Sequence, residues 1–457
     1  MMGKQIEQLS MRIVDISSLI PEQHLLKKIN RMVDFEFIYA KAEPYYARNG
    51  RPSTDPVSLI KMLLVGYLYG IRSERRLEEE VTLNIAYRWF CGFSMMDCIP
   101  DHSTFSQNRR RRFDDNELLR EIFNEIIMQC IDQGLVTGEA VVSDGSFLPG
   151  NVSEGSKTEC VMLVEKSTVK YMEALDAELS AQPGYRESEP MQIEKTVLSS
   201  STDEDCGYIH QERKKGLGYL TEMTVDTAYG IITGVDCYPA NRRESDIILD
   251  HIQRQMTDTG IEIEQIALDA GYDVGAVHRG LELLDIIGYC SAREIHNHAM
   301  KKGFEYEADY DRFRCMQGKA LSFYRVIYKK MNQGYYRLYR ISRKECAMCP
   351  YLAHCSIDRG AVRINASPFY PAYYRNRVRC ETQGYQKMKR LRSIWSEGTF
   401  AALKNWHNLK RIRKKGISRA SEECLLVAIA LNLKRMAGVN LFHFRSIVFV
   451  PFLMCQR

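Results

Sequence analysis

Two aspartates each follow an apolar, β-branched run and are followed at once by a turn sequence. Asp144 lies in EAVVSDGSF (residues 139–147), and Asp269 lies in IEQIALDAGYDVGAV (residues 263–277). Both runs are typical of strands that end at the aspartate, and ligands of open α/β sheets bind at the carboxyl ends of strands. Two neighbouring carboxylates repel each other unless a cation lies between them. Because Mg²⁺ binds one or two carboxylates together with substrate phosphates, we expect Asp144 and Asp269 to be metal ligands.

A third acid, Glu397, lies in a strongly basic segment. Residues 371–420 contain 14 Lys and Arg but only Glu381 and Glu397, so this window carries +12 while the rest of the chain sums to −7. Concentrated positive charge favours a polyanion such as DNA, because each neutralised phosphate releases counterions. Lys404 follows Glu397 by two turns on the same face of an expected helix. We expect Glu397 to bind metal and Lys404 to bind phosphate.

Further DNA contacts are expected from the same window and from an arginine run near residue 110: Arg390, Arg392, Lys410, Arg411, Arg413, Lys414, Lys415, Arg109 and Arg110. The alternative for these residues is a solvated, charge-rich helix surface. Each acid taken alone could equally be a helix cap or a surface charge. Asp226, Asp246 and Asp273 are expected to have such structural roles, at a turn, a helix start and the cap of the next helix.

The periodicity predicts an α/β protein with a helical N-terminal part. Asp55 and Ser73 are expected to cap two helices, and 116–133 forms another; a helix-turn-helix-like module or a plain helical scaffold would both fit. The polar stretch 151–213 is expected to be helical and partly irregular. Beyond it the patterns predict a hairpin turning at 227–230, a helix at 244–257, a strand at 263–268, a helix at 274–284, a strand at 286–290, a tyrosine-rich antiparallel insertion at 293–363, and helices at 397–413 and 418–436.

Fourteen cysteines are scattered along the chain without a secretion signal, which favours reduced thiols. Four of them lie in the insertion and could bind a structural Zn²⁺: Cys315, Cys346, Cys349 and Cys355. Ordinary thiols are the alternative, and His354 could replace one cysteine. The late apolar run 447–455 has nine residues and contains Pro451, whereas a bilayer span needs about 20. We therefore expect no membrane role and a cytoplasmic location.

Several segments, in order, resemble the DDE-type transposases of bacterial insertion sequences. They are GRPSTDPVSLIKMLLVGYLYGIRSERRLEEEV, PDHSTFSQNR, VVSDGSFLPGNVS, VDTAYGIITGVDCYPANRRESD, ALDAGYD, EGTFAALK and ECLLVAIALNLKRM. The resemblance runs from about residue 10 to 437. It implies an RNase H-like mixed sheet flanked by helices, an all-helical N-terminal domain and a mainly antiparallel β insertion. The first and fourth strands would carry Asp144 and Asp269, and a later helix would carry Glu397.

The resemblance also implies a domain order and a chemistry. The expected domains are a helical DNA-binding or dimerisation domain at 1–135, a catalytic core at 136–292 and 386–437, the insertion with its cysteines at 293–385, and an apolar tail at 438–457. Two Mg²⁺ or Mn²⁺ ions would activate a water or a 3′-hydroxyl and stabilise the leaving oxygen during phosphodiester cleavage and strand transfer. The expected partners are double-stranded DNA, as terminal inverted repeats and target, and a second copy of the chain, at the bacterial nucleoid.

One departure from the family pattern concerns the residues before Glu397. Related transposases often have tyrosine seven and arginine four residues before the glutamate, where this chain has Arg390 and Ser393. Arg390 or Arg392 could take over the phosphate contact. Two rival functions stay open: a non-catalytic DNA-binding or regulatory protein derived from a transposase, and a nuclease that cuts DNA without joining it.

Overall fold

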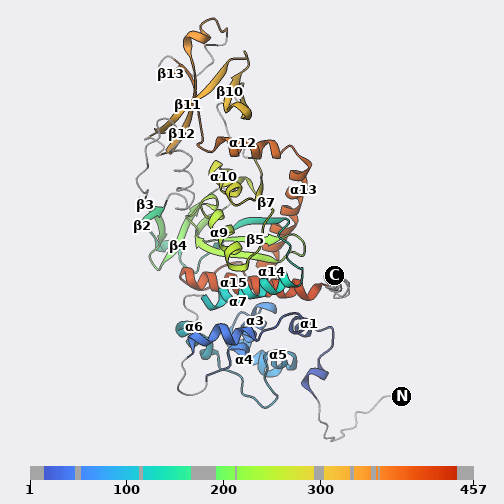
Figure 1. Ribbon diagram of the computed structural model, residues 1–457. Helices are drawn as coiled ribbons and strands as arrows, with labels where there is room; N and C mark the ends of the chain where they lie inside the picture. Colours follow the sequence, from blue (N-terminus) through green and yellow to red (C-terminus); the bar gives the residue numbers. More distant parts are fainter. Residues whose placement is uncertain are drawn as a thin grey trace, which may run out of the picture. The chain divides into compact units, whose positions relative to one another are not determined.

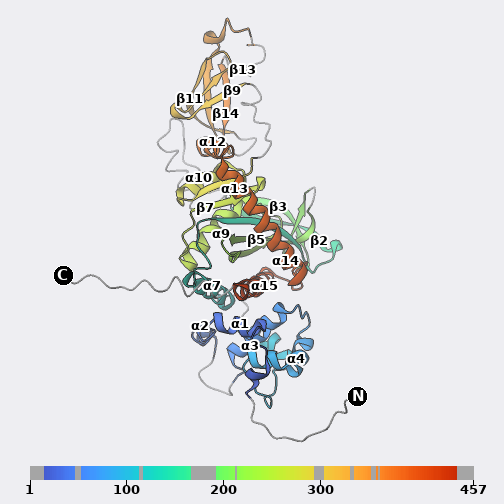
Figure 2. The ribbon, with the colours of Figure 1, turned by 90° about the vertical axis from the view of Figure 1, so that its right-hand side faces the viewer.

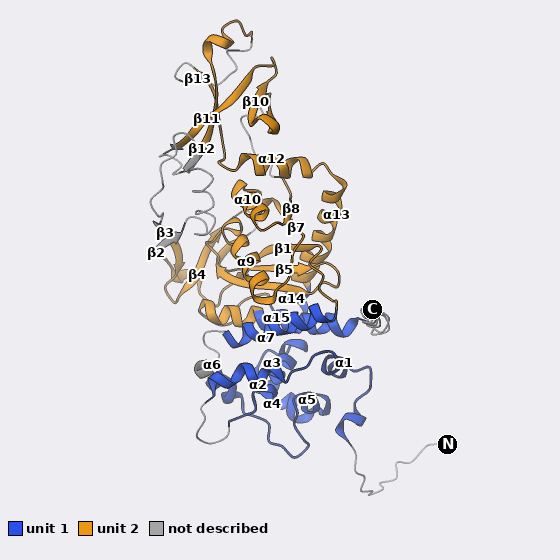
Figure 3. Ribbon diagram, viewed as in Figure 1, with its two compact units in different colours: residues 1–133, 402–409, 425–457 blue, residues 134–401, 410–424 orange. Residues whose placement is uncertain are grey.

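The computed structural model describes most of the chain, with gaps at both ends and at several places between them. The described residues are 15–46, 53–112, 117–165, 192–211, 214–292, 303–329, 334–350, 352, 357–358 and 361–439. The chain divides into two compact units (Figure 3). Unit 1 comprises residues 1–133, 402–409 and 425–457, and unit 2 comprises residues 134–401 and 410–424.

The N-terminal part of unit 1 is helical among its described residues, as predicted. Asp55 caps α3 by accepting a hydrogen bond from the Ser58 N–H at 2.8 Å, and Ser73 caps α4. Leu59, Leu64 and other apolar side chains of α3 are fully buried, which explains its stability despite its short length. The helices are η1 Ile16–Leu19, α1 Leu25–Met32, α2 Phe37–Ala42, η2 Glu43–Tyr45, α3 Pro56–Leu68, α4 Glu74–Leu83, α5 Ile85–Phe90, α6 His102–Arg112 and α7 Glu117–Asp132.

Unit 2 is built on a mixed sheet (Figures 1 and 2). Its described strands follow the order β2-β3-β4-β5-β1-β7-β8, and β6 pairs with the remaining length of the β5 edge. The strands are β1 Val141–Pro149, β2 Lys157–Glu165, β3 Gln192–Ser200, β4 Asp203–His210, β5 Lys215–Asp226, β6 Ile232–Pro239, β7 Gln265–Leu268 and β8 Ile287–Cys290.

The central five strands have the RNase H-like topology that the resemblance implied. β6, β5 and β1 are antiparallel neighbours, and β1, β7 and β8 are parallel neighbours, so the sheet order is third, second, first, fourth, fifth. Asp144 lies on the first of these strands, and Asp269 directly follows the fourth. The predicted fold class is confirmed.

Helices cover this sheet and connect its strands. α9 (Glu244–Thr259) packs against β5 and β6, whereas α13 (Gln383–Arg392) packs against β1, β7 and β8. The other elements are η3 Glu154–Ser156, η4 Ala270–Tyr272, α10 Gly275–Leu283, α12 Tyr370–Arg379, the π-helical turn η9 Ser393–Glu397, α14 Gly398–Trp406 and α15 Ile417–Gly438.

The insertion is a second, antiparallel sheet, as its tyrosine-rich runs predicted. Its described strands follow the order β13-β14-β12-β11-β10-β9. Phe313 and Tyr339 are fully buried and stack edge to face, with ring centroids 4.9 Å apart. The elements are β9 Phe304–Glu307, η5 Ala308–Tyr310, β10 Arg312–Cys315, β11 Ala320–Lys329, β12 Gly334–Ser342, η7 Arg343–Cys346, β13 Ile357–Asp358 and β14 Ala361–Ala366.

Three sequence predictions of local structure are wrong. β1 does not end at Asp144 but continues to Pro149, because it pairs with β5 along its whole length. Much of the stretch 151–213 forms strands β2, β3 and β4, which pair with one another away from the centre of the sheet. The helix expected at 397–413 ends at Trp406, and Asn408 just beyond it takes a left-handed conformation (φ 64°) that asparagine tolerates well.

No helix among the described residues is long and apolar enough to cross a membrane.

Candidate active site

The sheet brings the two predicted aspartates to the same place. β1 and β7 pair in parallel, with Val141 opposite Ile266 and Val142 opposite Ala267. Continuing this register by two residues places Asp144 beside Asp269. The electrostatic influence of Asp269 on Asp144 is consistent with this proximity.

The chain turns sharply after Asp269. The Asp269 side chain accepts a hydrogen bond from the Gly271 N–H at 2.6 Å and so caps the short η4 turn. The Cys290 thiol donates to the Asp269 carbonyl oxygen at 2.9 Å. These contacts hold the aspartate at the end of its strand and leave its carboxylate half-buried.

A fourth acid, Glu244, lies against both aspartate-bearing segments. A Cβ atom on Gly145 would lie 2.7 Å from Glu244 Oε1, and a Cβ atom on Gly271 would lie 2.8 Å from Glu244 Oε2. Both glycines therefore make room for this carboxylate. Sequence reasoning missed Glu244 because an acid in the first turn of a helix is common without any further role. The glycines that follow each aspartate are the signal that could have drawn attention to it.

Two cationic side chains balance these carboxylates. Lys214 Nζ lies 2.7 Å from Glu244 Oε1 and 3.3 Å from the Gly145 carbonyl oxygen. Arg392, one of the predicted DNA contacts, has its Nη1 atom 3.5 Å from Asp144 Oδ2. The donor set is made of hard carboxylate oxygens, which a metal ion would have to share with Lys214 and Arg392. These residues therefore fit the divalent cations that carboxylates prefer.

The pKa of Asp144 reflects this crowding. Burial and the Asp269 carboxylate together raise the pKa of Asp144 from 3.8 to about 7, and the Arg392 guanidinium lowers it only in part. Asp144 without a metal ion thus holds a proton well above the pH at which a free aspartate loses it. A divalent cation would displace that proton, so metal affinity is expected to rise with pH up to about 7.

Asp144 is expected to make the metal-free protein less stable as pH rises. The folded state binds the Asp144 proton more tightly than the unfolded state does, so this contribution to stability is complete below pH 3.8 and is lost as pH approaches 7. Asp144→Asn removes the effect. One pKa unit corresponds to ~1.4 kcal/mol. The free energy of unfolding of the variant, relative to that of the natural protein, should therefore rise by roughly 3 kcal/mol from pH 5 to pH 8. Urea unfolding in chelator at both pH values tests this, and parallel pH profiles would contradict it.

Glu397 lies in an irregular turn close to the same strand. The π-helical turn η9 packs against β1 and follows Arg392, the residue that contacts Asp144. Hydrogen bonds in a π turn join residues five apart, so Glu397 stacks over Arg392 along the helix. The Glu397 side chain is exposed. The turn thus brings the backbone at Glu397 close to the strand that carries Asp144.

The ligand atoms of the three predicted acids do not all lie within 4.8 Å of one another. Among the described residues, two sets have ligand atoms that all lie within 4.8 Å of one another: Asp273, His278 and Cys290, and Glu78, Asp101 and His102. Asp144, Asp269 and Glu397 form no such set. Ligands that share two ions about 4 Å apart spread over a wider area than ligands of one ion. The assignment of these acids as metal ligands stays a prediction.

The basic residues predicted to contact DNA differ in their surroundings. Arg413 and Lys414 lie near the buried acids Glu423 and Glu422, at 3.6 and 3.0 Å, and Arg411 donates to the Gly150 carbonyl oxygen. These three side chains therefore also hold the segment before α15 in place. The exposed residues are Arg390, Lys410, Arg411 and Lys415, of which Arg411 makes the contact just described. Lys404 is half-buried on α14, and Arg109 and Arg110 belong to α6.

Of the four predicted zinc ligands, Cys355 lies outside the described residues. Cys346 belongs to the apolar core of the insertion, and Cys315 and Cys349 pack against that core. The Cys349 N–H donates to the Cys346 carbonyl oxygen, which closes a tight turn between them. These three described thiols gather in one region without forming a ligand set within 4.8 Å. A zinc site there stays a prediction.

Two of the acids expected to be structural are deeply buried. Asp226 accepts hydrogen bonds from the N–H groups of Thr137 and Gly138, and so fastens the start of β1 to the hairpin. Asp273 does not cap the next helix, because its carboxylate lies 2.9 Å from His278 Nε2 and Val274 takes the cap position. Both acids are occupied by contacts inside the protein.

Comparison with known proteins identifies two domains in the chain. Residues 14–111 match the transposase domain DUF772, and residues 314–437 match a transposase DDE domain. No curated protein matches. Solved structures similar to the chain include the piggyBac transposase synaptic complex with hairpin DNA, at 11% identity and TM-score 0.27, over 93% of this chain and 83% of that chain. The Mos1 transposase paired-end complex is similar at 10% identity and TM-score 0.16, over 55% and 64%.

Proposed function

We propose, from the premise that the chain belongs to the DDE-type transposases, that it cuts the ends of a bacterial insertion sequence and joins them to target DNA. The observation that best supports this is the parallel register of β1 and β7, which brings Asp144 and Asp269 together at one end of the sheet. In this proposal the catalytic core is formed by residues 136–292 and 386–437, which the insertion separates.

Asp144, Asp269 and Glu397 would hold two Mg²⁺ or Mn²⁺ ions, and Glu244 is a further carboxylate at the same place. When bound, the two ions would activate the attacking water or 3′-hydroxyl and stabilise the leaving oxygen. The side chains have separate tasks. Asp144 lies on β1 and Asp269 directly after the neighbouring strand β7. Without cations, Lys214 pairs with Glu244 and Arg392 with Asp144; once cations are bound, Arg392 would be free to bind a DNA phosphate.

The proposed partner is double-stranded DNA, as terminal inverted repeats and as target. Arg390, Lys410 and Lys415 are exposed and could neutralise phosphates without breaking an ion pair within the protein. A homodimer is proposed because two element ends must be held together, and the helical N-terminal domain is proposed to bind DNA or to dimerise. A structural Zn²⁺ at the cysteines of the insertion is a separate part of the proposal, to be tested by elemental analysis of the purified protein.

A non-catalytic DNA-binding protein is the second candidate. It is favoured by Arg390 and Ser393, which replace the tyrosine and arginine usual before the glutamate, and by the contact of Arg392 with Asp144. Such a protein would bind the element ends and use its acids only to stabilise the fold.

The deciding experiment incubates the full chain with duplexes that carry the ends of its own element, in Mg²⁺, in Mn²⁺ and in chelator. The proposal expects cleavage that requires the divalent ion, and joining of precut 3′-hydroxyl ends to a target plasmid. Binding without cleavage or joining would support the regulatory protein. Cleavage without joining of precut ends would support a nuclease.

A further inference from the structure

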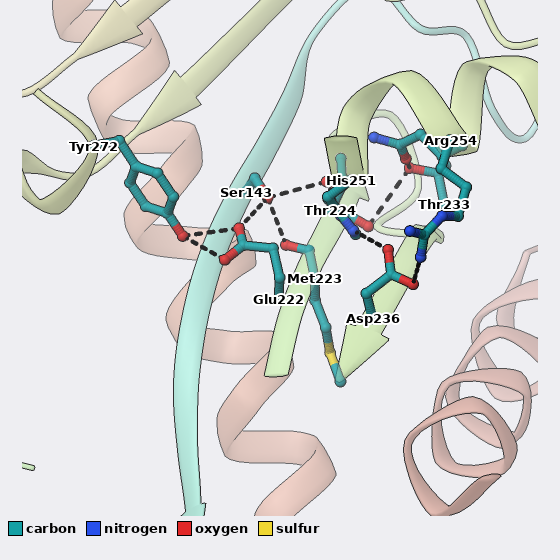
Figure 4. A network of polar contacts seen from close by, with 10 residues as sticks. Ser143, Glu222, Met223, Thr224, Thr233, Asp236, His251, Arg254 and Tyr272 are labelled. Carbon is teal, nitrogen blue, oxygen red and sulfur yellow. Dashed lines mark hydrogen bonds and ion pairs between the residues drawn. The ribbon is translucent and has the colours of Figure 1, made fainter. Parts of the chain in front are cut away.

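A carboxyl group with no exposed surface lies against the two segments that carry the aspartates. Glu222 is on β5, and its side chain is fully buried together with those of Ser143 and Tyr272 (Figure 4). The Tyr272 hydroxyl lies 2.8 and 2.7 Å from the two Glu222 oxygens, and the Ser143 hydroxyl donates to Oε1 at 2.7 Å. Both oxygens of the buried carboxyl thus have hydrogen-bond partners.

These partners belong to the two segments that carry the aspartates. Ser143 directly precedes Asp144 on β1, so the two side chains point to opposite faces of the strand. Tyr272 ends the η4 turn that the Asp269 side chain caps. Glu222 therefore connects the residue before one aspartate to the turn after the other.

A further chain of hydrogen bonds attaches this connection to α9. Thr224 donates to Ser143 at 3.0 Å and shares a hydrogen bond of 2.9 Å with His251 Nε2. His251 Nδ1 lies 2.7 Å from Asp236, which also accepts from Arg254 (Figure 4). Glu244, the fourth acid of the site, begins this same helix. One buried, hydrogen-bonded layer thus connects the segments that carry Asp144, Asp269 and Glu244.

Burying such a layer of polar and ionisable groups costs free energy. Burial raises the pKa of Glu222 well above its usual value, and hydrogen bonds from Tyr272 and Ser143 offset only part of the effect. Apolar side chains of similar volume often serve stability as well as buried polar groups do. Stability alone does not explain why a carboxyl group is kept here.

We propose that Glu222 and Tyr272 are positioning residues that set the spacing of Asp144 and Asp269 for divalent cations. This inference rests on the proposed function, because it assumes that the two aspartates bind metal. Neither residue needs to touch metal or DNA. They act through Ser143 and the η4 turn, in the way that groups behind metal ligands fix ligand geometry.

Mn²⁺ binding to the full-length protein without DNA tests the proposal, measured by calorimetry. Tyr272→Phe removes one hydroxyl and keeps the ring, and is expected to weaken Mn²⁺ binding about tenfold, the usual effect of removing such a support. Glu222→Ala should weaken binding at least as much. Glu222→Gln should restore most of the affinity, because an amide can accept at Oε1 and donate to the Tyr272 oxygen.

Tyr219→Phe is the matched control. Tyr219 is also on β5, is also fully buried, and donates its hydroxyl to the Asp203 carboxylate. Its replacement should lower the melting temperature about as much as Tyr272→Phe but leave Mn²⁺ binding unchanged. Equal Mn²⁺ affinity of Tyr272→Phe, Glu222→Ala and the natural protein would overturn the inference alone. If the natural protein binds Mn²⁺ no better than Asp144→Ala, the proposed function fails, and this inference fails with it.

Discussion

Replacing Asp269 with alanine is expected to abolish DNA cleavage in Mg²⁺ and, at the same time, to stabilise the metal-free protein near neutral pH. Loss of a ligand that supports several kcal/mol of charge stabilisation corresponds to a fall in rate of about 10³-fold. Burial and, after it, the Asp269 carboxylate raise the pKa of Asp144, so removal of Asp269 relieves a repulsion inside the fold. Loss of the η4 cap offsets about 1 kcal/mol of this gain. Cleavage assays and urea unfolding in chelator measure the two effects.

Asp246→Ala is the control for this prediction. Asp246 is an exposed acid in the first turn of α9, two residues after Glu244, and its removal changes the net charge by the same amount. It should leave cleavage within about twofold and cost a few tenths of a kcal/mol through the helix dipole. Cleavage by Asp269→Ala at the rate of the natural protein would refute an enzymatic role for this site. DNA binding should persist in both variants.

The strands that carry the aspartates could be predicted because their local sequences are unambiguous. Each is a short β-branched run, and the register that aligns them is set by the parallel pairing of two runs more than 100 residues apart. Spacing along the chain holds no information about that pairing, and only the family resemblance indicated it. The proximity of Asp144 and Asp269 was therefore predictable from the family resemblance and not from periodicity.

The glutamates behave differently. Glu222 is the charged residue inside the mostly apolar and β-branched run GYLTEMTV, and that local exception was a usable signal of a buried polar contact. Its partner Tyr272 is 50 residues away along the chain. The role of Glu222 depends on the meeting of β5, β1 and the η4 turn. Such a layer exists only in the assembled fold, so no single segment could reveal it.

The π turn that follows α13 was not predicted from the sequence. Helical periodicity continues through residues 383–406, which hides the π turn at 393–397. A π turn needs one extra residue and is stabilised by its surroundings, and here the Trp395 ring occupies the space above Gly230. A Cβ atom at Gly230 would lie 2.2 Å from that ring. A side chain at Gly230 would therefore clash with Trp395, a residue of the π turn.

Glu397→Gln is expected to reduce cleavage about 10³-fold, and Glu244→Gln by a smaller factor of about ten to a hundred. The difference arises from what each carboxylate must give up to bind a cation. Glu397 is exposed, whereas Glu244 must first release Lys214, whose ammonium lies 2.7 Å away. The net contribution of Glu244 to metal binding is therefore reduced, because metal binding breaks its ion pair with Lys214.

Lys214→Ala provides the cross-check, because it leaves Glu244 without that competing cation. If Glu244 binds metal, Lys214→Ala should lower the Mn²⁺ concentration needed for half-maximal cleavage, and the double variant Lys214→Ala, Glu244→Gln should lose this gain. The reverse ranking is equally informative. Full activity in Glu397→Gln together with no activity in Glu244→Gln would make Glu244 the acid that completes the set. The π turn would then serve only to bring Arg392 to Asp144, since that contact does not depend on the Glu397 carboxylate.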